Sequence, residues 1–231
     1  MTRILVTGAS RGIGAAIVAT LDQPGISVAS HATRQGLAFD LAEADAPARL
    51  WDAAVHQLGG VDVLINNAGI FEANPLDGDD ADWSAGWART LQVNLTASAE
   101  LCRRAVLAWQ REGRRGRIVN VASRAAYRGD SPAHWHYAAS KAGMVAVTKT
   151  IARGYAREGI LAFAICPGFT MTGMADDYLA SRGGDKLLAD IPLGRVAEPA
   201  EVASVARYLA LEAPASMTGA VIDVNGASYV R

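Results

Sequence analysis

Short apolar runs alternate with longer segments of helical period from one end of the chain to the other. The expected strands are Ile4–Thr7, Ser27–Ser30, Leu37–Phe39, Val61–Asn66, Gly116–Ala122, Leu161–Cys166 and Ala220–Val224. The expected helices are Gly12–Leu21, Glu43–Leu58, Asp82–Glu112, His136–Glu158 and Pro199–Leu211. This alternation is typical of βαβ units around a parallel sheet, and most runs lack polar alternation, as strands covered on both faces do. We therefore predict an α/β fold with a doubly wound, mostly parallel, seven-stranded sheet and helices on both faces.

The length of the chain favours one domain. It has 231 residues, against about 150 for an average domain, and it contains no internal repeat or low-complexity linker. Hydrophobic residues make up 51% of it, which is enough for a large core. We expect residues 1–231 to form a single domain, from which Thr172–Pro192 departs as a helical excursion.

One connection is too short to hold a crossover helix. Only the six residues His31–Gly36 separate the second and third expected strands, whereas a parallel crossover ordinarily takes a dozen or more. We predict that the helix is absent at this point. The third strand, at the edge of the sheet, should then be stunted.

The charge balance argues against nucleic acid and membrane surfaces as partners. The formal net charge is −1, so no broad field attracts polyanions. The most basic run holds no aromatic side chain on which a base could stack, and we interpret it as a solvated helix end. Its members are Arg111, Arg114, Arg115 and Arg117. No apolar stretch reaches the 18 or so residues of a membrane span, and the N-terminus has no secretion signal.

Cysteine and histidine spacing gives no indication of a metal site. Cys102 and Cys166 lie far apart and form no C-x-x-C pair, which excludes a zinc or disulfide framework of the usual spacing. His134 and His136 have no carboxylate or cysteine at a ligand spacing nearby. We expect a cytoplasmic protein without a metal.

A glycine-rich turn joins the first strand to the first helix. It reads Thr7-Gly8-Ala9-Ser10-Arg11-Gly12-Ile13-Gly14. Glycines allow unusual dihedral angles and close approach of a ligand to the backbone, and a helix N-terminus offers unpaired N–H groups to a pyrophosphate. Between a strand and a helix, this pattern predicts a dinucleotide site. Taken alone, it is also compatible with a tight turn that binds nothing.

A tyrosine and a lysine are spaced to act together on a proton. Tyr137 is the only one of six tyrosines with a lysine four residues later, Lys141. Positions i and i+4 share one face of a helix, so the ammonium group can lie beside the phenol. A free phenol has a pKa near 10 and can donate a proton to the oxygen that forms when a ketone accepts hydride.

Together these segments resemble the short-chain dehydrogenase/reductase family, whose domain is a Rossmann fold. The resemblance extends over residues 3–226 and is strongest to ketoreductases like 3-oxoacyl-carrier-protein reductase, with Leu193-Gly194-Arg195 and Thr218-Gly219 as further landmarks. Three more segments match the family's cofactor-binding pattern, each after a strand. They are Asp40-Leu41 at the adenine, Asn66-Asn67-Ala68-Gly69 at the adenine ribose, and Pro167-Gly168-Phe169-Thr170-Met171-Thr172 at the nicotinamide carboxamide.

The resemblance also implies a catalytic tetrad and a site for the cofactor. Ser123, at the end of the fifth strand, matches the serine that polarises the carbonyl, and Asn94 matches the asparagine that completes a proton relay with Tyr137 and Lys141. The implied cofactor contacts come from Gly8, Ser10, Arg11, Gly12, Ile13, Gly14, Thr33, Arg34, Asp40, Leu41, Asn67, Ala68, Gly69, Tyr137, Lys141, Pro167, Gly168, Thr170 and Thr172.

The charge after the second strand bears on the choice of dinucleotide. A 2′-phosphate requires cations, whereas a ribose diol requires a carboxylate. No acid follows that strand, but Thr33 and Arg34 do, and Arg11 lies in the glycine turn. This favours NADP(H) over NAD(H), although Arg34 could also be an ordinary solvated arginine.

The expected activity is NADPH-dependent reduction of a medium-sized, partly apolar carbonyl compound, with 3-oxoacyl compounds as candidates. The family's pocket maps onto Ser123, Arg124, Tyr127, Trp135, Tyr137, Phe169, Met174 and Tyr178. The alternatives are an NAD-dependent alcohol dehydrogenase and a regulator that binds a dinucleotide without catalysis. The resemblance further implies a homotetramer, built through the two longest helices and the last strand.

Overall fold

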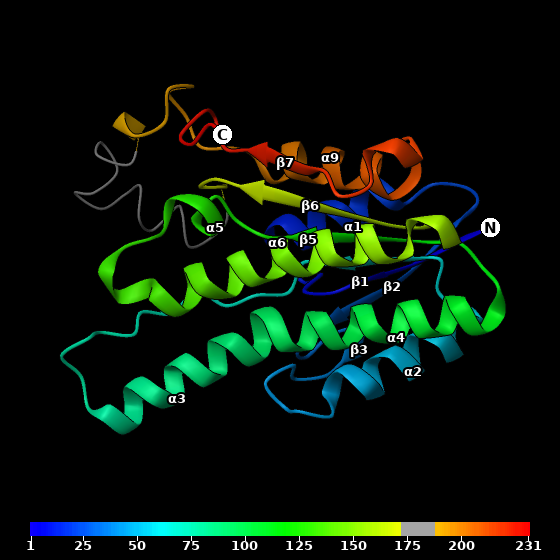
Figure 1. Ribbon diagram of the computed structural model, residues 1–231, viewed down its shortest axis with the longest axis horizontal. Coiled ribbons are helices and arrows are strands. Elements are labelled where there is room, and N and C mark those ends of the chain that lie inside the picture. Colours follow the sequence, from blue (N-terminus) through cyan, green and yellow to red (C-terminus); the bar gives the residue numbers. More distant parts are fainter. Residues whose placement is uncertain (172–187) are drawn as a thin grey trace.

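A seven-stranded sheet forms the middle layer of the molecule (Figure 1). The computed structural model describes residues 1–171 and 188–231. In this part the strands are β1 Thr2–Val6, β2 Ile26–Ala32, β3 Leu37–Ala38, β4 Val63–Asn66, β5 Gly116–Val121, β6 Ile160–Pro167 and β7 Val221–Val224. Their order is β3-β2-β1-β4-β5-β6-β7, and every neighbouring pair is parallel. The predicted doubly wound α/β sheet is confirmed.

Helices cover both faces of the sheet (Figure 1). The helices are α1 Gly12–Leu21, α2 Ala46–Leu58, α3 Asp80–Leu91, α4 Ala97–Glu112, α5 Ala125–Arg128, α6 Trp135–Tyr155 and α9 Pro199–Leu211, with short 3-10 turns at Pro132–His134, Ala156–Glu158 and Ala215–Met217. α2, α4 and α6 lie on one face, and α1 packs with α9 on the other.

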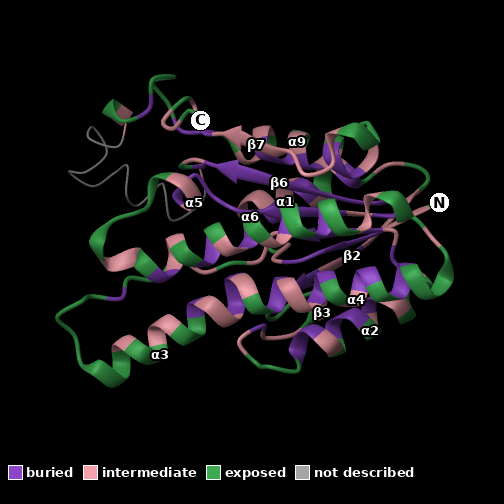
Figure 2. Ribbon diagram, viewed as in Figure 1, coloured by how far each residue is buried: buried purple, intermediate pink, exposed green. Residues whose placement is uncertain are grey.

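The central strands β4, β5 and β6 are buried because both of their faces meet a helix layer, whereas the edge strands β3 and β7 are partly exposed (Figure 2). Alternate side chains of β1 enter different cores: Leu5 packs with α2 and α4, whereas Ile4 and Val6 pack with α1 and α9. This two-sided burial explains the absence of polar alternation in the sequence. No helix in the described residues is long and apolar enough to cross a membrane.

The link between β2 and β3 has no helix, as predicted. Only residues 33–36 separate the two strands, and β3 is two residues long. A right-handed crossover would have placed its helix beside α1. On that side a surface hollow of about 460 Å³ lies against α1 and β2, lined by apolar residues that include Ala15, Val18, Ile26 and Val28.

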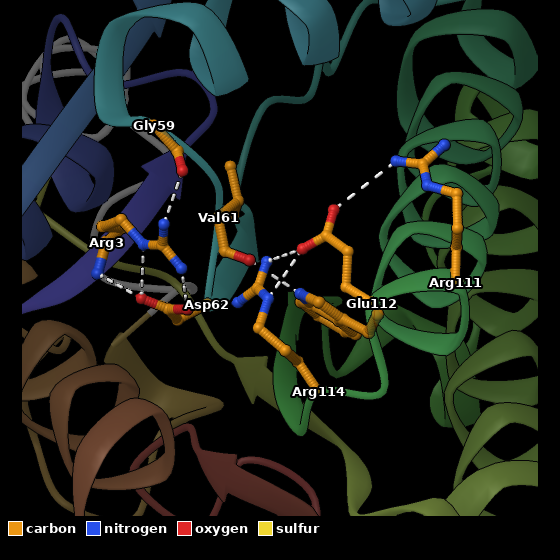
Figure 3. Close-up of polar contacts among 8 residues, drawn as sticks. Arg3, Gly59, Val61, Asp62, Arg111, Glu112 and Arg114 are labelled. Carbon is orange, nitrogen blue, oxygen red and sulfur yellow. Dashed lines mark hydrogen bonds and ion pairs between the residues drawn. The ribbon is translucent and has the colours of Figure 1, made fainter.

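The edge of the sheet at the N-terminal ends of the strands is tied together by charges (Figure 3). Asp62, just before β4, accepts hydrogen bonds from the Arg3 guanidinium at 2.7 and 2.9 Å and from Arg114 Nη1 at 2.6 Å. Arg114 also donates to Glu112 at 2.7 Å. The network therefore connects β1, β4 and the end of α4.

These contacts correct our interpretation of the basic run as a solvated helix end. Arg114 belongs to the network just described, and Arg117 lies within β5, where it donates to the backbone oxygens of Leu209 and Ala213 at 3.0 and 2.9 Å. Arg117 is partly buried, and burial lowers the pKa of its guanidinium. The acceptors Asp62, Leu209 and Ala213 come from distant parts of the chain, and the local pattern of charges does not reveal such contacts.

Candidate active site

The glycine turn forms a tight backbone cradle at the C-terminal end of β1. A methyl group at Gly14 would lie 2.0 Å from the Gly8 carbonyl oxygen, and one at Gly8 would lie 2.7 Å from the Ala68 Cα. Asn67 closes the cradle, because its side-chain amide donates to the backbone oxygens of Thr7 and Gly8 at 3.1 and 2.9 Å. These contacts require glycine at both positions.

Helix α1 begins without a side-chain cap. Its N-cap residue is Arg11, whose side chain accepts no N–H, and the first turn contains no acidic residue. By contrast, α9 begins with a capping box between Glu198 and Glu201. The first N–H groups of α1 are therefore available to an anion such as a pyrophosphate. Gly12 and Ile13, both predicted cofactor contacts, belong to this turn.

A buried histidine braces the cradle from the side of β2. His31 Nδ1 accepts the Gly8 N–H at 3.3 Å, and its Nε2 lies 3.0 Å from the Phe39 carbonyl oxygen. This arrangement fits a neutral ring that donates through Nε2, and burial lowers the pKa of His31. We did not predict a role for His31 from the sequence, although its place at the end of β2 could have suggested a contact with the glycine turn.

The corner beyond β2 is cationic and open. Thr33 and Arg34 are exposed after β2, and Ser10 and Arg11 are exposed in the glycine turn. Within residues 1–171 and 188–231, the side chains of Arg11 and Arg34 donate no hydrogen bond. Two unpaired guanidinium groups at this corner fit a 2′-phosphate.

The predicted adenine contacts follow β3. Asp40 Oδ1 accepts the Ala42 N–H at 3.0 Å, which closes a turn, and Leu41 is buried. The Leu41 carbonyl oxygen accepts from Gln92 Nε2 at 3.3 Å. These contacts hold the turn against the helix that carries Asn94.

The segment after β4 links the cradle to the predicted catalytic residues. A methyl group at Gly69 would lie 3.3 Å from Asn94 Oδ1 and 3.3 Å from Lys141 Nζ. Two residues earlier, Asn67 holds the glycine turn, and the N–H groups of Asn67 and Ala68 both donate to Thr7 Oγ1 at 3.0 Å. One short stretch of chain therefore contacts both halves of the predicted site.

Asn94 lies in a π-helical turn. We expected one helix over Asp82–Glu112, but Gln92–Thr96 forms a π turn between α3 and α4. There the Asn94 amide donates to the Ile70 carbonyl at 2.9 Å and accepts the Ile70 N–H at 2.8 Å. This pair of hydrogen bonds to a segment outside the helix explains the local widening of the helix. Such π turns are frequent at functional sites.

Tyr137, Ser123 and Lys141 meet at the C-terminal end of β5. Tyr137 and Lys141 lie on α6, with Nζ 5.7 Å from the centre of the phenol ring. Lys141 Nζ donates to the Val121 carbonyl oxygen at 3.0 Å. Desolvation raises the pKa of Tyr137 to about 12, while a side-chain hydrogen bond with Ser123 opposes that rise. Burial lowers the pKa of Lys141 to about 8.

A chain of buried amides holds this region rigid. Asn66 Nδ2 donates to Asn120 Oδ1 at 2.9 Å, and Asn120 Nδ2 donates to Thr148 Oγ1 at 2.8 Å. The three residues come from β4, β5 and α6 and are almost fully buried. These hydrogen bonds link the three elements, although Asn66 Oδ1 is buried and has no hydrogen-bond partner among the described residues.

The predicted carboxamide segment follows β6. The Gly168 N–H donates to Val224 O at 2.9 Å, and a methyl group at Gly168 would lie 2.8 Å from the Asn225 Cβ. Pro167 and Thr170 are buried. Thr172, Met174 and Tyr178 lie outside the described residues, as does most of the expected excursion Thr172–Pro192.

The predicted substrate residues differ in their surroundings. Arg124 is buried, with its guanidinium carbon 4.8 Å from the centre of the Phe169 ring. Trp135 is exposed at the start of α6. Tyr127 stacks on Tyr229, with centroids 5.8 Å apart, and receives a hydrogen bond from Arg231 at 3.1 Å. The C-terminus thus occupies one face of Tyr127.

An aromatic wall beside Tyr137, formed by Phe71 and His134, was not predicted from the sequence. Phe71 meets the Tyr137 ring edge to face, with centroids 4.7 Å apart, and stacks on His134 at 3.9 Å. His136, which follows two residues later, is buried and stacks with Trp87 at 6.5 Å. A lone phenylalanine after the Asn66–Gly69 segment gives no local signal of such a contact. No cluster of potential metal ligands is present among the described residues.

Comparison with known proteins decides the family. The profile of the family described as Enoyl-(Acyl carrier protein) reductase matches residues 8–227. The 3-oxoacyl-[acyl-carrier-protein] reductase FabG of Vibrio cholerae is 35% identical over 98% of this chain and 96% of its own. The chain is a short-chain dehydrogenase/reductase. It is therefore an NAD(P)-dependent oxidoreductase acting on carbonyl or hydroxyl groups, as members of this family are.

Other relatives of this short-chain dehydrogenase/reductase carry related names. The acetoacetyl-CoA reductase of Rhizobium meliloti is 34% identical over 99% of both chains. The structure of a candidate 2-deoxy-D-gluconate 3-dehydrogenase from Agrobacterium tumefaciens, solved with bound NADP, superimposes with a TM-score of 0.88. That structure is 29% identical and covers 100% of this chain and 97% of its own. The resemblance stated from the sequence is confirmed.

Proposed function

We propose that the protein is an NADPH-dependent ketoreductase that reduces a medium-sized, partly apolar carbonyl compound. The observation that carries this proposal is the position of Gly69, with Lys141 and Asn94 on one side and Asn67 two residues away in the glycine cradle. Because of this position, a ligand held in the cradle can extend to the phenol of Tyr137. The names of the FabG and acetoacetyl-CoA reductase relatives make 3-oxoacyl compounds the first candidates.

The residues present fit a nicotinamide dinucleotide. The cradle is too tight for any side chain at Gly14, the first turn of α1 has no cap, and the corner beyond β2 is cationic. Gly12–Gly14 would hold the pyrophosphate, and Arg11, Thr33 and Arg34 would hold a 2′-phosphate. When bound, the reduced dinucleotide supplies the hydride that the carbonyl carbon accepts.

Four side chains of the protein would supply the proton and stabilise the charge that develops on the carbonyl oxygen. The Tyr137 hydroxyl, whose pKa of about 12 keeps it protonated at neutral pH, donates its proton to the carbonyl oxygen. Ser123 hydrogen-bonds that oxygen and stabilises the developing charge. Lys141 and Asn94 return a proton to Tyr137, so that one ketone, one hydride from the reduced dinucleotide and one proton from solvent yield one alcohol.

Substitution of the phenol tests the proposed reaction. In Tyr137→Phe, NADPH binding should persist while turnover falls by about 10²- to 10⁴-fold, the usual contribution of a general acid. The assay follows nicotinamide absorbance with a panel that includes acetoacetyl thioesters, 3-oxo esters and simple ketones. Tyr155→Phe, at the far end of the same helix, is the matched control and should keep wild-type turnover. Full activity in Tyr137→Phe would refute the assignment.

Two arginines test the choice of cofactor. We expect Arg11→Ser and Arg34→Ser each to raise the Kd for NADPH by about 10-fold, in keeping with the loss of one charge-assisted hydrogen bond. The Kd for NADH should stay constant, because a ribose diol does not need these cations. Tighter binding of NADH than NADPH by the wild-type protein would overturn the preference.

Assembly and location complete the proposal. We propose a cytoplasmic homotetramer formed through α3–α4, α6 and β7. Two features support this: α4 leaves Leu107 about half exposed, and β7 is the edge strand of the sheet. Light scattering during size-exclusion chromatography distinguishes a tetramer from a monomer of 24.2 kDa.

A further inference from the structure

Arg124 is a buried cation whose side chain donates no hydrogen bond to another residue in the described part of the chain. The residue is 8% exposed, and its Nη1 atom is buried without a hydrogen-bond partner. In the described part of the chain its guanidinium makes one ion pair, with Asp190 Oδ2 at 3.5 Å. A guanidinium has five N–H donors, and leaving a buried one unpaired is costly. The side chain is therefore prepared for an acceptor that the described part of the polypeptide does not provide.

The ion pair with Asp190 does not balance the charge of Arg124. The same oxygen, Asp190 Oδ2, accepts a hydrogen bond of 2.7 Å from Arg128. Two guanidinium groups thus share one carboxylate, and the shorter contact belongs to Arg128. Asp130 lies close enough to influence the Arg124 pKa, but in the described residues it forms no ion pair with either arginine. Among the described residues, this place therefore carries one positive charge in excess.

Arg124 is the next residue along the chain after Ser123, one of the predicted catalytic residues. The Ser123 side chain lies close enough to Tyr137 to oppose the rise that burial causes in the pKa of the phenol, and the Arg124 N–H donates to Pro167 O at 3.0 Å. Its guanidinium carbon lies 4.8 Å from the centre of the Phe169 ring, at the end of β6. A cation held over an aromatic ring in this way keeps its edge free for a planar acceptor.

We propose that Arg124 binds a carboxylate group of the substrate, so that the preferred substrates are oxo acids rather than neutral ketones or esters. This inference rests on the proposed ketoreductase function, because it assigns a substrate class to that site. A carboxylate is favoured because its two oxygens match the guanidinium fork and its single negative charge matches the one positive charge left over. Phe169 would pack against the carbon chain between the two groups.

Matched acids and esters test the proposal. The substrates are acetoacetate, 4-oxopentanoate and 5-oxohexanoate, each compared with its methyl ester, in the presence of NADPH. In the wild-type protein, kcat/KM for the best acid should exceed that for its ester. In Arg124→Gln the value for the acid should fall by about 10- to 100-fold, mainly through KM, because the removed contact is a charge-assisted hydrogen bond. The value for the ester should change by less than about threefold.

Two further variants separate binding from architecture. Arg128→Lys keeps a second cation beside Asp190 and should leave the ratio of acid to ester unchanged. Arg124→Lys keeps the charge but loses the fork, and should recover part of the preference for the acid. If Arg124→Gln lowers acids and esters equally, or if Arg128→Lys lowers the acid to ester ratio as much, Arg124 is a structural residue and the proposal is wrong.

A binding measurement distinguishes failure of this proposal from failure of the proposed function. Pentanoate and pentanamide cannot be reduced, and their binding to the protein with NADPH present can be followed by nicotinamide fluorescence. We expect pentanoate to bind more tightly than pentanamide, and Arg124→Gln to abolish the difference. If no ketone is reduced but this difference persists, the ketoreductase function fails while the carboxylate site stands. Equal binding of both compounds by the wild-type protein overturns the carboxylate site.

Discussion

Replacement of Gly14 by alanine is the most direct test of the glycine cradle. The new methyl group would lie 2.0 Å from the Gly8 carbonyl oxygen and 2.5 Å from Asn67 Nδ2. Side-chain carbons do not approach other atoms closer than 3.0 Å, so the Gly8 backbone must move by about 1 Å. That movement disturbs the hydrogen bond of 2.9 Å from Asn67 to Gly8.

The magnitude follows from three contributions. Overpacking costs about 1–3 kcal/mol, the two hydrogen bonds of Asn67 contribute about 1 kcal/mol each, and alanine returns about 1 kcal/mol of helix propensity. We expect Gly14→Ala to lose about 2–4 kcal/mol of unfolding free energy. For a domain of this size the Tm should fall by about 5–15 °C.

The assay combines urea unfolding with a fluorescence titration of NADPH. Binding of NADPH should weaken by at least about tenfold, because the displaced backbone is the part that would contact the pyrophosphate. The matched control is Gly154→Ala, in the last turn of α6, where no atom lies within 4 Å of the new methyl group. That variant should gain about 0.5–1 kcal/mol. Wild-type Tm and NADPH affinity in Gly14→Ala would show that the cradle is not tight.

Three further predictions concern titrating groups. Burial alone would raise the pKa of Asp62, but Arg3 and Arg114 together hold it below the ordinary value, so its ion pairs stabilise the fold above about pH 4. Asp62→Asn should therefore cost about 1–3 kcal/mol at pH 7, and the difference in unfolding free energy from wild type should vanish as the pH falls below 4. Ketone reduction should slow as the pH rises through about 8, where Lys141 loses its proton. Lys141→Arg should shift that decline to higher pH. A rate of ketone reduction that does not change with pH in this range would contradict the proton relay. His31→Leu should weaken NADPH binding by about 2- to 10-fold. It should also abolish a loss of affinity that the wild type should show only at a pH lower than about 6.5, the ordinary histidine pKa, because burial lowers the pKa of His31 and protonation of Nδ1 would remove the acceptor of the Gly8 N–H.

The features that could be predicted from the sequence are those set by local pattern. α1 and α9 begin and end at the predicted residues, because in each case a glycine or proline marks the start and an apolar period continues to the end. The absence of a crossover helix between β2 and β3 followed from the length of that connection alone. The tyrosine and lysine were found because four residues bring two side chains to the same helix face.

The features that were missed depend on partners far along the chain. The π turn at Asn94 arises from hydrogen bonds to Ile70, 24 residues away. Arg117 is partly buried because its acceptors, Leu209 and Ala213, come from α9 and the turn after it. The wall formed by Phe71 and His134 joins two loops that no periodic pattern connects. Sequence periodicity identifies each element but does not determine which side chains from different elements come into contact.

Because the link between β2 and β3 contains no helix, its charges can change without a change in the packing of the fold. In a chain with a crossover helix there, a change of charge beside the ribose would also disturb packing. Here residues 33–36 are exposed and support no helix, so evolution or an engineer can exchange their charges at little cost to folding. Nucleotide preference should be the trait of this protein that drifts most freely, while the phenol and its ammonium neighbour stay fixed by the core.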